Sequence, residues 1–167
     1  MEIVVSDTNI FIDFIKIGML DRMFGLPFRF HTVDSIIAEI TNESQRQEVL
    51  QVVSEGRLHV HELDEQENME VAMMYVNNYN NASVQDCSVW YYAKKYDYRL
   101  LTGDKKLRLS ASSDGVLVSG ILFLFDKMLE CSTDKDFIIS KIVELCKYNK
   151  RLPKKLVDEL ILKYKSR

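Results

Sequence analysis

The chain has 167 residues, of which 47% are apolar, 28% charged and 10% aromatic, and its formal net charge is −3. This composition is typical of a soluble globular protein, and the length suits one domain with a substantial core. We expect no transmembrane span, because the longest apolar run, residues 115–125, is shorter than the roughly 18 residues that a bilayer requires.

Short apolar runs alternate with helical patterns along the first 120 residues. Strands are predicted at 2–6, 28–32, 58–63, 98–102 and 116–118, with helices at 10–24, 34–55, 65–80 and 84–96. After residue 120 only helices are expected, at 120–130, 134–148 and 153–165. The alternation predicts right-handed crossovers and a parallel sheet that is covered on both faces.

We therefore predict the α/β class, as a three-layer α/β/α sandwich around a central parallel sheet of four to five strands. The expected organisation is a single domain over residues 1–167. Its α/β core spans residues 1–120, and residues 121–167 form a helical C-terminal extension.

Four acids stand near the predicted ends of strands and starts of helices. Asp7 follows the first strand, and Asp104 follows the fourth in the sequence LLTGD. Glu39 lies among isoleucines after the second strand, and Asp86 follows Ser83 at the spacing of a helix capping box. Sites on parallel sheets form beyond the carboxyl ends of the strands. Asp7 and Asp104 therefore come together if their strands are neighbours, and Asp86 joins them if the loop before its helix folds back.

Several carboxylates at one edge would repel one another and raise one another's pKa values unless a cation lay between them. Oxygen ligands with few histidines or cysteines nearby indicate Mg²⁺ or Mn²⁺ over zinc. Each acid also has a purely structural interpretation. Asp7 and Asp86 can be helix caps, Asp104 can be a turn residue, and Glu39 can be exposed or ion-paired.

Three motifs together closely resemble the PIN-domain nucleases, especially the VapC-type toxins: DTN at 7–9, IIAEI at 36–40, and SVQDCSVWYYAKKYDYRLLTGDKKLR at 83–108. The resemblance covers about residues 1–120, and the tail is similar to the helical ending of some bacterial PIN-like proteins. It implies an endoribonuclease that uses Mg²⁺ or Mn²⁺, with RNA as substrate, a cognate antitoxin as protein partner, and a homodimer as the assembly.

By the same resemblance, the catalytic acids are Asp7, Glu39, Asp86 and Asp104. Asp7, Asp86 and Asp104 bind the metal, while Asn9 and Thr102 are supporting polar groups. The alternative is a catalytically inactive PIN-like module that binds protein or RNA.

The charge is distributed unevenly. Residues 1–134 hold 12 Lys and Arg against 21 Asp and Glu, whereas residues 135–167 hold 10 against 4. We predict that a cluster near Pro153, here called the basic turn, binds nucleic acid; it comprises Lys150, Arg151, Lys154 and Lys155. The competing interpretation is that the tail neutralises the acidic face of its own fold or of a partner subunit.

Other candidate sites are weaker. His59 and His61 share one strand face, but no third ligand lies nearby, so we expect an exposed or hydrogen-bonded pair. The Met and Tyr series at 69–79 has helical spacing and is predicted to be core. A phosphatase of the haloacid dehalogenase type would need an aspartate where Asn9 stands.

Cysteine use and the N-terminus bear on location. Cys87, Cys131 and Cys146 are widely spaced and contain no C-x-x-C pair, which favours reduced thiols in the cytoplasm. No basic flank precedes the first apolar run, so we expect no signal peptide.

Overall fold

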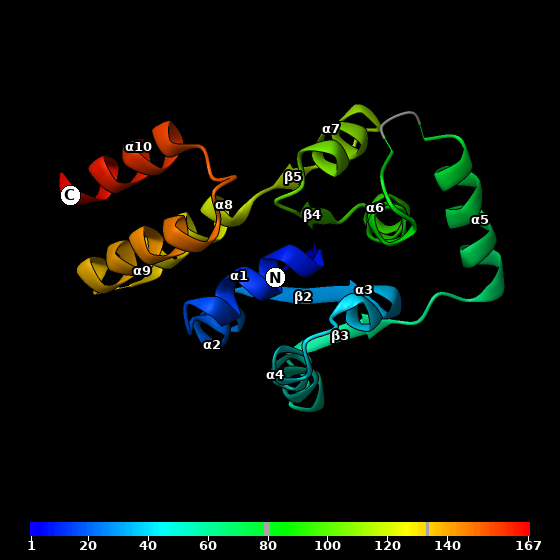
Figure 1. The fold of residues 1–167 in the computed structure, drawn as a ribbon, viewed down its shortest axis with the longest axis horizontal. Coiled ribbons are helices and arrows are strands. Elements are labelled where there is room, and N and C mark those ends of the chain that lie inside the picture. The colour runs from blue at the N-terminus through cyan, green and yellow to red at the C-terminus, as the bar shows by residue number, and fades with distance from the viewer. Residues whose placement is uncertain (79–80, 133) are drawn as a thin grey trace.

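Five parallel strands form the central sheet in the order β3-β2-β1-β4-β5 (Figure 1). The computed structural model describes residues 1–78, 81–132 and 134–167. The strands are β1 (Glu2–Ser6), β2 (Phe28–Val33), β3 (Leu58–His61), β4 (Arg99–Leu101) and β5 (Val118–Ser119). In the register, Val4 of β1 lies beside Phe30 on one side and Arg99 on the other. The chain leaves β1 toward β3 and returns to β4, so the strand order reverses between β1 and β4.

Helices cover both faces of this sheet (Figure 1). Those of the α/β portion are α1 (Thr8–Lys16), α2 (Leu20–Phe24), α3 (Asp34–Glu39), α4 (Glu43–Ser54), α5 (Glu65–Val76), α6 (Val84–Tyr96) and α7 (Lys105–Ser113). Helix α6 packs across β1, β2 and β4 and contacts α5 and α7, whereas α1 contacts α2 and α4. The predicted α/β/α architecture with a parallel sheet is confirmed.

Two predicted helices are each divided in two, and one helix was not predicted. The stretch 10–24 breaks after α1, where Gly18 takes a left-handed conformation with φ +67°. The stretch 34–55 breaks before α4, where the Asn42 side chain accepts a hydrogen bond from the amide of Gln45. The helix that was not predicted, α7, contains few apolar residues; Leu107 and Ala111 are its buried ones. The predicted helix 65–80 ends at Val76, and its last two positions lie outside the described residues.

The prediction that the Met and Tyr series of 69–79 is core was wrong. Met69 and Met73 are 59% and 64% exposed, whereas Val71 is buried. Helix α5 packs against α6 along one narrow stripe, so most of its apolar side chains face away from the protein. Position 79 of the series lies outside the described residues.

Three helices follow the last strand: α8 (Ile121–Cys131), α9 (Lys135–Tyr148) and α10 (Lys154–Lys165). They extend from the α/β layers beside α1 and α2 (Figure 1). The Phe125 ring of α8 lies 5.2 Å from the Phe14 ring of α1, and both belong to the cluster of buried residues that includes Val4 and Val5. No helix in the described ranges is both long and apolar enough to cross a membrane.

Candidate functional site

Asp7 lies at the junction of β1 and α1, beside the end of β4. Its backbone amide donates to the Leu101 carbonyl at 3.0 Å, which extends the pairing of β1 with β4 by one residue. The residue is 3% exposed. Its Oδ1 accepts from the Thr8 amide at 2.7 Å, and its Oδ2 accepts from the Thr102 hydroxyl at 2.8 Å. The strand order thus places Asp7, the most deeply buried of the four acids, at the carboxyl ends of β1 and β4, where the order of the strands reverses.

Glu39 reaches the same edge from the last residue of α3. Its Oε2 accepts a hydrogen bond from the Thr8 hydroxyl at 2.6 Å. The neighbouring residues Ile36, Ile37 and Ile40 are buried, but Glu39 itself is exposed, which corrects the expectation of an apolar setting for this carboxylate. Thr8 was not singled out from the sequence, although it is the middle residue of the DTN motif.

Asp86 lies in the first turn of α6, which contacts both α3 and β1. It forms the predicted capping box: its Oδ2 accepts from the Ser83 amide at 3.0 Å, and the Ser83 hydroxyl accepts from the Asp86 amide at 3.0 Å. The carboxylate is half-buried, and it is close enough to raise the pKa of Asp7. The start of α6 therefore lies near the Asp7 carboxylate.

Asp104 follows β4 and caps α7, where its Oδ1 accepts from the Leu107 amide at 2.9 Å. Its own amide donates to the Thr102 hydroxyl oxygen at 3.1 Å. Thr102 is fully buried and so links Asp104 to Asp7 through one hydroxyl group. Asn9, the other supporting residue, is half-buried in the first turn of α1.

At this edge of the sheet, the carboxylates of Asp86 and Glu39 are close enough to affect the protonation of Asp7. The pKa of the Asp7 carboxyl is raised to about 7. Burial is the largest cause, and the carboxylates of Asp86 and Glu39 also raise this pKa, whereas the hydrogen bonds from Thr102 and from the Thr8 amide lower it. In the described part of the chain, both groups that donate to this carboxylate, the Thr8 amide and the Thr102 hydroxyl, are neutral.

This all-oxygen donor set suits Mg²⁺ or Mn²⁺ in chemistry and in charge. Among the described residues, no three His, Cys, Asp or Glu side chains are already close enough together to hold an ion. Asp86 and Asp104 would have to turn from their helix caps to join Asp7 around a metal. Those two caps are therefore the part of the site that metal binding would rearrange.

The two histidines and the basic turn lie elsewhere. His61 Nε2 is 3.1 Å from both carboxylate oxygens of the buried Glu67, and the His59 ring lies 4.6 Å from that of His31. The basic turn connects α9 with α10, and all four of its side chains are exposed.

Comparison with known families decides the assignment of the chain. The profile of the family described as DUF3368: PIN domain matches residues 3–166. The chain belongs to the PIN-domain family. A search of curated proteins found no match.

Solved structures that resemble this PIN-domain chain include the following three. The structure of VapBC2 from Rickettsia felis bound to a promoter DNA fragment has a TM-score of 0.49 at 13% identity, covering 71% of this chain and 98% of that one. FitAcB from Neisseria gonorrhoeae gives 0.43 at 14% identity, covering 69% and 95%. FitAB bound to the IR36 DNA fragment gives 0.46 at 15% identity, covering 71% and 94%.

Proposed function

We propose that this PIN-domain protein is an endoribonuclease that depends on Mg²⁺ or Mn²⁺. One observation supports the proposal above all others: the Asp7 carboxylate is buried beside two further carboxylates and contacts only neutral donors in the described part of the chain. A divalent cation would stabilise the ionised form that this environment otherwise disfavours.

Asp7, Asp86 and Asp104 would hold the metal in this proposal, and Glu39 would be the fourth catalytic acid. A bound divalent ion supplies Lewis-acid stabilisation of phosphate charge and lowers the pKa of a water ligand. Thr102 orients Asp7 through its hydroxyl group. Thr8 holds one oxygen of Glu39, so that Oε1 can accept a proton from the attacking water.

Substrate and partners follow from the charges and from the family resemblance. The basic turn would hold RNA phosphates, because the catalytic portion has an excess of acids. In the described residues, no basic-turn side chain forms a direct ion pair, and only Arg151 is near enough to an acid, Asp13, to lower its pKa; most of the basic turn therefore stays available to phosphates. The proposal includes a cognate antitoxin, a homodimer, and a cytoplasmic location that suits the free thiols.

A second candidate function is an inactive PIN-like module that binds RNA or protein. One observation favours it: Asp86 and Asp104 both accept backbone amides in helix caps, which is the purely structural role considered from the sequence.

A cleavage assay separates the two candidates. Single-stranded RNA is incubated with wild-type protein, Asp7→Asn and Asp86→Asn, in Mn²⁺ and in EDTA. Asp34→Asn is the matched control, because Asp34 also follows a strand and accepts the amide of the next residue, but is exposed. We expect wild type and Asp34→Asn to cleave RNA in Mn²⁺ and not in EDTA. We expect Asp7→Asn to lose both cleavage and the Mn²⁺ binding that calorimetry detects. Wild-type protein that binds RNA without cutting it would establish the binding module instead.

A further inference from the structure

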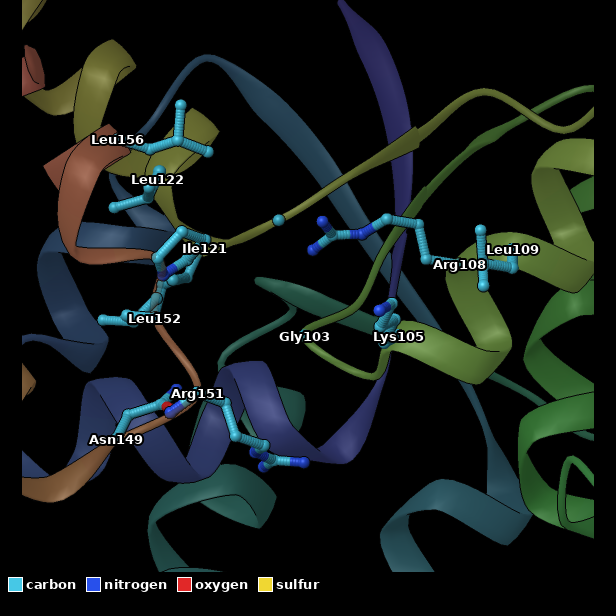
Figure 2. Close-up of a pocket in the computed structure, with 12 residues that line it drawn as sticks. Gly103, Lys105, Arg108, Leu109, Ile121, Leu122, Asn149, Arg151, Leu152 and Leu156 are labelled. Atoms are coloured by element: carbon cyan, nitrogen blue, oxygen red, sulfur yellow. The ribbon is translucent and has the colours of Figure 1, made fainter.

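A groove of about 810 Å³ opens between the start of α7, the β5–α8 connection and the α9–α10 turn (Figure 2). Its charged lining consists of Lys105, Arg108 and Arg151, and it contains no carboxylate. Its apolar lining comes from the same three segments: Leu109, Ile121, Leu122, Leu152 and Leu156. The groove therefore combines positive charge with aliphatic side chains contributed from both sides, and these five residues are here called the floor.

The three cations of the groove lie outside the direct ion pairs of the described residues, although Arg151 is close enough to Asp13 to lower the pKa of that carboxyl. In the ranges that the structure describes, neither Lys105, Arg108 nor Arg151 forms an ion pair. Lys163, on the neighbouring α10, pairs with Asp126 at 3.1 Å. Unpaired cations around a cavity without acids attract an anionic ligand.

Arg108 joins the groove to the candidate active site. Its Nη2 lies 3.5 Å from the carbonyl oxygen of Thr102, whose hydroxyl group donates to Asp7. Gly103, which separates Thr102 from Asp104, lines the groove. A ligand bound in the groove would therefore lie against the loop that carries Asp104.

Neighbouring segments shape both walls of the groove. On one wall a Cβ atom at Gly120 would come within 3.0 Å of Arg108 Nη2, so glycine leaves room for the guanidinium group. On the other wall the Asn149 side chain donates to Asp13 at 2.8 Å and accepts from the Arg151 amide at 3.0 Å, which ties the α9–α10 turn to α1. Figure 2 shows Arg108 and Arg151 extending from these opposite walls.

We propose that this groove binds one nucleotide of the RNA strand, next to the phosphate that the acids attack. The cations contact phosphates, and the leucine floor packs against a base. The volume lies within the range of about 300–1,000 Å³ that is usual for small-ligand sites. Cations around an aliphatic floor match a ligand that is both anionic and flat and apolar. The inference rests on the proposed function for its substrate, but it assigns a binding site that the acids do not require.

Binding is measured by fluorescence anisotropy with a labelled single-stranded oligoribonucleotide in EDTA, which prevents cleavage. The phosphate variant carries Arg108→Gln and Arg151→Gln, and the floor variant carries Leu109→Ser and Leu156→Ser, two half-exposed leucines. The matched control carries Arg29→Gln and Arg46→Gln, which are exposed and lie outside the groove. Thermal melts check that each variant is folded.

Three results are expected. The phosphate variant loses about tenfold or more in affinity, and its salt dependence weakens by about 0.7 in slope for each lost contact. The floor variant also loses about tenfold, because serine removes apolar area against which the base packs, but it keeps the wild-type slope, because no charge changes. Inorganic polyphosphate competes less well against RNA on wild-type protein than on the floor variant, and the control binds RNA as wild type does.

The outcomes separate this inference from the proposed nuclease. If wild-type protein cleaves RNA in Mn²⁺ while both groove variants bind RNA as it does, the groove assignment is overturned and the nuclease stands. If wild-type protein binds RNA through the groove and never cleaves it, the groove stands and the nuclease does not. A floor variant that keeps its RNA affinity but changes its elution volume in gel filtration makes the groove a contact between copies, which also overturns the inference.

Discussion

Replacing Asp7 with asparagine should stabilise the metal-free protein at neutral and alkaline pH. Burial raises the pKa of this carboxyl from its ordinary value of 3.8 to about 7 in the folded protein. Between these two values the folded state binds a proton that the unfolded state has lost, so the contribution of Asp7 to stability falls as pH rises. That contribution is intact below 3.8 and is lost as the pH passes through about 7.

The magnitude follows from about 1.4 kcal/mol for each unit of difference in pKa. At pH 8 the ionised carboxylate costs the folded state about 4 kcal/mol, and at pH 5 the cost is about 1.5 kcal/mol. Asparagine keeps an oxygen for the Thr8 amide but turns an NH₂ group toward the Thr102 hydroxyl, at a cost of about 1 kcal/mol. We therefore expect Asp7→Asn to be about 2–3 kcal/mol more stable than wild type at pH 8, which is about 5–10 °C in Tm for a chain of this size.

The assay is unfolding by heat or urea in EDTA from pH 5 to pH 8, followed by far-UV circular dichroism. The difference between wild type and Asp7→Asn isolates this carboxyl, because the histidines and the other acids titrate in both proteins. The control is Asp34→Asn, which removes an exposed carboxylate at the equivalent position after β2. Adding Mn²⁺ at pH 8 should stabilise wild type and leave Asp7→Asn unchanged.

Two results would refute this reasoning. Stability curves of wild type and Asp7→Asn that run parallel from pH 5 to pH 8 would mean that the carboxyl does not titrate in this range. A loss of stability in Asp7→Asn at every pH would mean that Asp7 stabilises the folded state as a helix cap and that its carboxylate does not destabilise it.

Two further predictions concern the surroundings of the acids. Thr102→Val should raise the pKa of Asp7 further, since the Thr102 hydroxyl lowers it. The same substitution should cost about 1–3 kcal/mol of stability, because it leaves the Asp104 amide unpaired. A pH titration of unfolding and Mn²⁺ calorimetry measure both effects, and an unchanged pH profile would contradict the expected rise in pKa. Reversal of the four basic-turn charges to glutamate should weaken RNA binding and flatten its salt dependence, at a slope of about 0.7 per lost contact, without changing Mn²⁺ affinity. If the reversal lowered the melting temperature or dissociated a dimer while RNA affinity held, the basic turn would instead neutralise acidic surface.

The sequence by itself determined the elements and most of their local chemistry. Alternating apolar runs and helical stretches predicted the parallel sheet, and the spacing of Ser83 and Asp86 predicted the capping box that the structure contains. Such features depend on residues a few positions apart, whose geometry is set by the helix or strand period. The same local reasoning was wrong for α5, because periodicity shows that a helix has an apolar side but not whether a neighbour covers it.

Only the tertiary structure decided which groups meet. The hydrogen bond from Thr102 to Asp7 joins residues 95 positions apart, and the bond from Thr8 to Glu39 joins residues 31 apart. The groove is likewise assembled from α7, the start of α8 and the α9–α10 turn. The raised pKa of Asp7 is also a tertiary property, because desolvation and charge–charge repulsion depend on distances through space. Those distances follow from the strand order and from the folding of the C-terminal helices onto α1, which no local pattern of residues encodes.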